Sequence, residues 1–307
     1  MRLTEINYKI NQLSLNDVSL SLKSTSSDTL VNLIKFKELI QKIEEYKLDF
    51  YNEEINILKK SSIYSTIQNE LTIYEYKEKT KIYNISKYIV DSLNSLKLVF
   101  SNILPAPSEN ELSIKLPTTN NLENLLKDMS KIERQLSIIV NDKEVNTFIT
   151  LSKWEYGSYW LDIAIGTSFA ISLIGSISWS AAYISSLIKK DKEHSLYLQK
   201  IETDAQMLSA IKEKQLLYLD KLYETEVLHI QENYFSNVEN NERNKKIKDT
   251  IKLFADIIQR GGEFQPSLIS PKEIKDSYPD FKNIEHIPSK VLQIPEKTEN
   301  HQEQEQE

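Results

Sequence analysis

The residue types that most often carry catalysis or bind metal are scarce in this sequence. The 307 residues contain no cysteine, which excludes thiolate zinc sites, iron–sulfur clusters, disulfides and cysteine nucleophiles within this chain. The four histidines lie far apart, at positions 194, 229, 286 and 301, and none has the short spacing of a zinc site. We therefore expect no metal centre.

Glycine and acidic residues give the same expectation for cofactors and catalysis. The five glycines, at positions 157, 166, 175, 261 and 262, cannot form a phosphate loop, a dinucleotide fingerprint or a nucleophile elbow. Acidic pairs such as Glu44/Glu45 and Glu53/Glu54 lie in amphipathic stretches, where paired carboxylates usually form a solvated face. We expect no cofactor and no enzymatic activity; an enzyme would need a pocket with convergent polar groups.

Charge argues against one class of partner. The net charge is −7, and ten acidic and five basic residues fall in 262–307, so that segment carries −5 of it. The rest of the chain is close to neutral and has no basic stripe. We expect no nucleic-acid partner, because nucleic-acid binding needs such a stripe.

The hydrophobic pattern predicts a mainly α fold that begins with a mainly helical N-terminal domain, 1–106. Short alternation in 5–24 predicts one or two strands. A helix is predicted from Asp28 to about Leu58 and another over Lys79–Ile103, with apolar residues at three- and four-residue spacing. The segment 63–76 fits strand and helix equally. Pro105 and Pro107 end this region.

A small α+β unit is predicted over 108–165. Glu111–Leu116 alternates and is followed by a cluster of helix-capping residues at 118–120 and an amphipathic helix. Two further strands are predicted over Val145–Trp154 and Tyr156–Ile165, with a turn at Gly157 between them. The order of elements is therefore β-α-β-β.

The stretch Ile163–Ile188 predicts one long apolar helix. Its 26 residues include no charge and would extend about 39 Å, which exceeds the roughly 30 Å of a bilayer core. Aromatic and basic residues flank it, as they do at membrane interfaces. The predicted interface anchors are Trp154, Trp160, Tyr183, Lys189 and Lys190.

Small residues recur every four positions along this predicted helix. They form a weakly polar ridge that would permit close helix packing in lipid, with serine hydrogen bonds across the contact. The predicted ridge consists of Ala164, Ser168, Ser172, Gly175, Ser176 and Ser180. It predicts self-association if the helix lies in a membrane, and tight packing on a neighbour if the helix lies in a soluble core.

Topology complicates a simple single-pass interpretation. The first residues, MRLTEINYKINQL, lack the apolar region of a signal peptide. The basic flank at 189–192 would keep the C-terminal side cytoplasmic. The helix would then orient against this rule, lie in the membrane surface, or stay buried until a trigger releases it. We expect membrane association on the cytoplasmic side.

The apolar helix is predicted to continue into an amphipathic helical hairpin over 189–262, whose apolar repeat is too irregular to assign as a coiled coil. Gly261 and Gly262 end this region. The remainder, 263–307, is predicted to be an extended or disordered acidic tail.

The sequence Glu155-Tyr-Gly157-Ser158-Tyr-Trp160 is the most distinctive local motif. A strand pair with Gly-Ser-x-Trp and a following long apolar helix resembles a loose set of uncharacterised bacterial and phage-encoded proteins over about 112–190. The resemblance implies a small α+β unit followed by a transmembrane helix, and no activity.

Two functional hypotheses follow. The first is a non-enzymatic, membrane-associated helical protein that acts through helix insertion or anchoring and through association with itself or with a protein partner, as a membrane-targeting effector or pore-former. The alternative is a soluble helical scaffold or binding module, in which 163–188 is a buried core helix.

Overall fold

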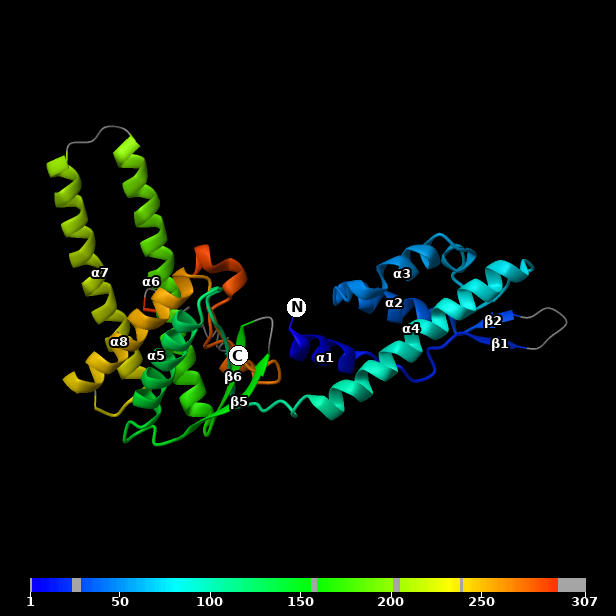
Figure 1. Ribbon diagram of the computed structural model, residues 1–307, viewed down its shortest axis with the longest axis horizontal. Coiled ribbons are helices and arrows are strands. Elements are labelled where there is room, and N and C mark those ends of the chain that lie inside the picture. The colour runs from blue at the N-terminus through cyan, green and yellow to red at the C-terminus, as the bar shows by residue number, and fades with distance from the viewer. Residues whose placement is uncertain (1, 24–28, 156–158, 201–204, 238–239, 292–307) are drawn as a thin grey trace, which may run out of the picture. The chain divides into compact units, whose positions relative to one another are not determined.

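The computed structural model is mainly α-helical and has two compact units, Met1–Ala106 and Pro107–Glu307 (Figure 1). It describes residues 2–23, 29–155, 159–200, 205–237 and 240–291. The predicted turn at Gly157 therefore lies outside the described residues.

The N-terminal unit contains helices and one small sheet. In chain order its elements are α1 (Leu3–Gln12), β1 (Ser21–Lys23), β2 (Thr29–Val31), α2 (Leu33–Glu45), the 3-10 turn η1 (Asp49–Tyr51), α3 (Asn52–Lys59), the 3-10 turn η2 (Ser62–Ser65), β3 (Glu70–Thr72) and α4 (Tyr76–Ile103). The strands form an antiparallel sheet in the order β1-β2-β3. The predicted helix over Lys79–Ile103 is confirmed as most of α4.

Of the one or two strands predicted in 5–24, the structure has β1, but two other expectations for this unit were wrong. Ile6 and Ile10 belong to helix α1 and not to a strand, because residues four apart share a helix face as well as a strand face. The helix predicted from Asp28 begins only at Leu33, after strand β2. It also ends at Glu45 instead of continuing to Leu58, and Lys47 follows with φ of 54°.

The C-terminal unit contains the predicted small α+β arrangement. Its first elements are β4 (Glu111–Lys115), α5 (Leu122–Val140), β5 (Ile149–Glu155) and β6 (Trp160–Ile165). The order β-α-β-β is confirmed, and the Asn121 side chain caps α5 by accepting from the backbone N–H of Glu123 at 2.8 Å. The antiparallel sheet has the order β5-β6-β4-β7, in which β7 (Glu263–Pro266) comes from the C-terminal segment.

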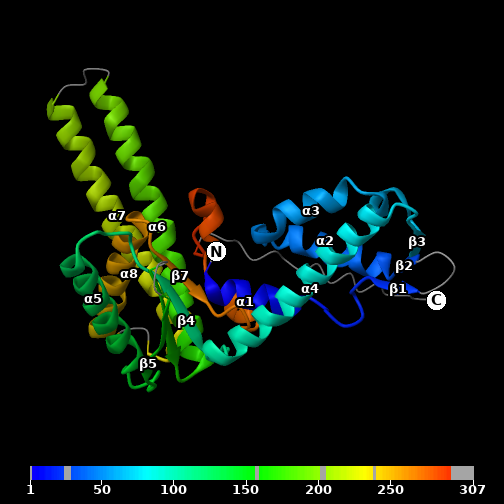
Figure 2. The same ribbon diagram turned by 45° about the vertical axis from the view of Figure 1, so that its right-hand side comes forward.

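The rest of this unit is helical. Its elements are α6 (Ser168–Lys200), α7 (Ala205–Tyr234), α8 (Asn241–Gln259), α9 (Lys272–Lys275) and the 3-10 turn η3 (Phe281–His286). Helix α6 contacts α7, α8, α9, β7 and η3, and Figures 1 and 2 both show α6 and α7 side by side as a hairpin. Helix α8 ends at Gln259, and Gly261 follows with a backbone φ of 89°, in agreement with the predicted helix end at Gly261 and Gly262.

Two boundaries differ from the prediction. The apolar helix begins at Ser168, because Ile163–Ile165 completes strand β6 and pairs with β4 and β5. The segment predicted as an extended or disordered tail is folded as far as position 291. Its side chains Phe264, Ile274 and Tyr278 are buried in the same core as α6, and this burial offsets the loss of chain entropy.

Candidate functional site

Helix α6 is the centre of the C-terminal unit, and its polar side chains find partners inside that unit. The hydroxyl of Tyr234, at the end of α7, donates to the backbone carbonyl of Ser172 at 3.0 Å. The same oxygen lies 2.8 Å from Ser176 Oγ, which is then the donor of that bond. Two positions of the predicted ridge thus bind one tyrosine of the neighbouring helix.

Gly175 is the tightest point on the ridge. A Cβ atom built there would lie 2.2 Å from Ser277 Oγ and 2.7 Å from the ring of Tyr278. The Tyr278 hydroxyl also donates to the carbonyl of Ile171 at 3.0 Å, and burial raises the pKa of that phenol well above its usual value. The C-terminal segment therefore lies directly on α6 at its only described internal glycine.

The next turn of α6 contacts a buried carboxylate of α7. Glu226 of α7 is 1% exposed and accepts hydrogen bonds from Ser180 Oγ and Ser289 Oγ, each at 2.6 Å. Beside it, the Trp179 indole N–H donates to the Pro288 carbonyl at 2.8 Å. These contacts join α6 to α7 and to the end of the C-terminal segment.

The other predicted site residues occupy different positions. Ala164 lies in strand β6, opposite Glu111 and Thr150, and so is not on the helix ridge. Ser168 is the first residue of α6 and is exposed. The structure therefore brings together only Ser172, Gly175, Ser176 and Ser180.

The predicted interface anchors are also dispersed. Trp154 lies in β5 and Trp160 in β6, so both belong to the sheet. Tyr183 is buried in α6. Lys189 forms an ion pair with Glu285 at 2.6 Å, and Lys190 is exposed.

The segment Ser168–Leu196 has the length and hydropathy of a membrane span, with a mean hydropathy of 1.5 in its most apolar window, but 72% of that window is buried within the protein. The core helix of a soluble protein meets the same criteria. Length and composition therefore do not distinguish a membrane helix from a core helix here.

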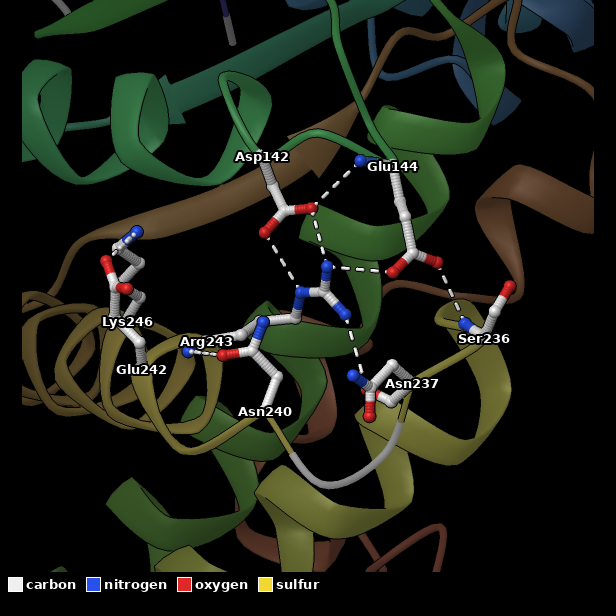
Figure 3. A network of polar contacts seen from close by, with 8 residues as sticks. All are labelled: Asp142, Glu144, Ser236, Asn237, Asn240, Glu242, Arg243 and Lys246. Carbon is white, nitrogen blue, oxygen red and sulfur yellow. Dashed lines mark hydrogen bonds and ion pairs between the residues drawn. The ribbon is translucent and has the colours of Figure 1, made fainter.

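An ion-pair network fixes the base of the α6–α7 hairpin (Figure 3). Arg243 of α8 donates to both carboxylate oxygens of Asp142 at 2.9 Å and lies 2.8 Å from Glu144. Glu144 in turn accepts from the backbone N–H of Ser236 at 2.8 Å, and the guanidinium lies 4.1 Å from the centre of the Phe235 ring. The network connects the loop after α5 to the turn between α7 and α8.

The electrostatics of this network favour its charged form. Burial raises the pKa of Asp142, but the hydrogen bonds and charge of Arg243 outweigh that effect, so the pKa of Asp142 is lowered overall. Burial lowers the pKa of Arg243, but the hydrogen bonds that Arg243 donates to Asp142 and Glu144 outweigh that effect, so the pKa of Arg243 is raised overall. Bidentate hydrogen bonds between a guanidinium and a carboxylate are stronger than those between neutral groups.

The far half of the hairpin presents apolar side chains to solvent. Figure 1 shows α6 and α7 extending past α5 and α8 in this unit. The exposed apolar residues here are Leu196, Met207, Leu216, Leu217 and Tyr218. A groove of about 520 Å³ between the helices is lined by Ile188, Leu196, Leu216 and Leu219, with Lys192 and Lys212 among its polar residues. We define these residues as the hairpin surface.

Sequence reasoning missed several residues that matter most here. Tyr234, Tyr278 and Glu226 contact the ridge, and Arg243 holds the base, but each is one of many similar residues in the sequence and none stands in a motif. Among the described residues, no group of three histidine or acidic side chains is placed to hold a metal ion.

Comparison with known proteins identifies one similar bacterial protein. The chain is 27% identical to the uncharacterised protein YqaP of Bacillus subtilis (strain 168) over 281 residues, which cover 86% of this chain and 87% of that protein. No protein-family model matches the chain. No solved structure matches it either.

Proposed function

We propose that this protein is a non-enzymatic helical binding module, with α6 as its core helix and the hairpin surface as the region that contacts a protein partner. The observation that carries the proposal is the exposed apolar surface at the far half of the hairpin, where Leu216 and Leu217 are 68% and 61% exposed. Contiguous exposed apolar residues with a polar rim are typical of protein–protein contact.

The contacts of α6 support a soluble core position for this helix. Extracting α6 into lipid would separate Ser180 from Glu226 and Ser176 from Tyr234. Each buried polar group left without its partner costs about 1–3 kcal/mol, and a charged group costs more. It would also expose the apolar side chains of α8 that α6 covers, including Ile251 and Phe254.

The arrangement of the hairpin suits a binding role. Its base is fixed by Arg243 and by Tyr234, so the far half is presented on a preformed support. A surface ordered before binding loses less conformational entropy on association.

The test is a pair of matched variants in the native host. Leu216→Lys with Leu217→Lys should abolish cross-linking of the full chain to its partner, whereas Leu98→Lys with Val99→Lys on exposed positions of α4 should leave it unchanged. Circular dichroism and sedimentation would check that both variants fold. Equal cross-linking in both variants would contradict the assignment of the hairpin surface.

A second candidate function is membrane insertion of α6, followed by self-association or pore formation. It is favoured by one observation: the apolar part of α6, about 20 residues to Ile188, matches a bilayer core of roughly 30 Å. Insertion would require release of Tyr278 and Pro288 from the helix. This candidate predicts flotation with anionic vesicles and dye leakage, and a protein that neither floats nor releases dye would exclude it.

A further inference from the structure

Strand β5 is an edge of the larger sheet. It pairs with β6 on one side, and no other described strand pairs with it. An edge strand offers a row of unpaired backbone N–H and C=O groups to another extended chain. Natural proteins often protect such an edge with charge or cover it.

The side chains of β5 divide cleanly between the two faces of the sheet. Leu151 pairs with Ile163 and Trp154 with Leu161, and both partners face the core. A bulge between Leu151 and Lys153 places these two apolar side chains on the same face although they are three residues apart. Lys153 lies on the other face, where it forms an ion pair with Asp162 at 3.1 Å.

The apolar face of this edge opens into a groove. The groove has a volume of about 340 Å³ and runs between β5 and α5, with Met129, Ile132, Leu151, Leu161 and Ile163 in its lining. Leu151 and Trp154 are 63% and 40% exposed. On α5, Leu122 and Leu126 are exposed and lie on the helical stripe that leads to Met129. The apolar layer between helix and sheet is therefore open at this edge.

The strand is complementary to itself in one antiparallel register. A two-fold axis between Ser152 and Lys153 would place Leu151 opposite Trp154 of a second copy, and Trp154 opposite Leu151 of that copy. The same register pairs Thr150 with Glu155 of the second copy. Thr150 and Glu155 share the other face of the sheet, since their partners in β6 are Ala164 and Trp160. In each of these pairs the two opposing side chains therefore lie on the same face of the joined sheet. The bulges of the two strands meet at the axis.

We propose that β5 pairs with β5 of a second copy of this chain, so that two four-stranded sheets join into one continuous sheet. The groove beside α5 receives Trp154 and Leu151 of the second copy. Antiparallel pairing of one edge with itself closes on a two-fold axis and ends at two copies. The surface is separate from the hairpin surface, so the two proposals can fail independently.

The first experiment is sedimentation velocity of the full chain over a range of concentrations. We expect a dimer, and we expect Leu151→Lys to raise its dissociation constant at least about tenfold, since one central apolar side chain contributes this much at an interface. Leu98→Lys, at a similarly exposed position in the N-terminal unit, is the matched control and should leave the dimer intact. Circular dichroism would verify folding of each variant.

The second experiment uses the absence of cysteine from the chain. Leu151→Cys and Trp154→Cys variants would be prepared singly, mixed and oxidised gently. Side chains directly opposite across an antiparallel pair have Cβ atoms about 4.5–5.5 Å apart, so the mixture should form disulfide-linked dimers and either variant alone should form few. A monomeric wild-type protein would overturn the proposal. So would a dimer that resists Leu151→Lys and dissociates on Leu217→Lys, or one that gives equal cross-linking in all three cysteine samples.

Discussion

Replacing Gly175 by alanine tests whether α6 is packed as a core helix. At a solvent-exposed position of a helix, Gly→Ala is stabilising by about 0.5–1 kcal/mol, because glycine loses more chain entropy on folding than alanine does. Here the new Cβ would lie 2.2 Å from Ser277 Oγ and 2.7 Å from the ring of Tyr278. Overpacking of this kind costs about 1–3 kcal/mol.

The cost of overpacking exceeds the gain from chain entropy, so we expect Gly175→Ala to lower the free energy of unfolding by about 0.5–2 kcal/mol. For a unit of this size that corresponds to a fall in Tm of about 1–8 °C, measured by thermal denaturation in detergent-free buffer. Ser209→Ala, at an exposed position of α7, is the control and should gain a few tenths of a kcal/mol from helix propensity. If Gly175→Ala stabilises the protein as Ser209→Ala does, the C-terminal segment does not pack on α6 and the reasoning fails.

Three further predictions concern the base and the far half of the hairpin. Arg243→Met leaves the carboxylates of Asp142 and Glu144 without their counter-charge and should lower the free energy of unfolding in urea by about 3 kcal/mol; a loss below about 1 kcal/mol would contradict the role of this network. The pKa of Asp142 is lowered in the folded state from its ordinary value of 3.8. The charged Asp142 carboxylate therefore stabilises the folded protein fully above about pH 4, and this contribution is lost as the pH falls through the folded pKa. Acid titrations of stability should therefore be less steep for Asp142→Asn than for the wild type, and equal slopes would refute this. Leu217→Lys should change stability by less than about 0.5 kcal/mol because Leu217 is 61% exposed, and a larger loss in urea would show that Leu217 is packed.

The sequence predicted those elements whose signal is local. Helices α4 and α5 follow from apolar residues at three- and four-residue spacing, and strand β4 follows from alternation before Pro117. Helix α1 was mistaken for a strand because Ile6 and Ile10, four residues apart, share a face in either structure.

Long-range pairing explains most of what the sequence did not predict. Strand β7 forms only by pairing with β4, and the ion pair between Lys115 and Glu263 joins residues 148 positions apart. The spacing of Ser172, Ser176 and Ser180 revealed a ridge of small residues. It did not reveal that Tyr234 and Glu226 are the partners of this ridge, because hydrogen bonds between distant segments leave no periodic trace in sequence.

Fractionation of the native protein, with an alkaline carbonate wash of the membrane pellet, tests the central claim most directly. If α6 is a core helix whose polar groups bind Tyr234, Tyr278 and Glu226, the protein will be found in the soluble fraction without detergent, and the wash will release any that sediments with membranes. Protein that stays in the washed pellet and is released only by detergent would contradict that account and place α6 in the bilayer.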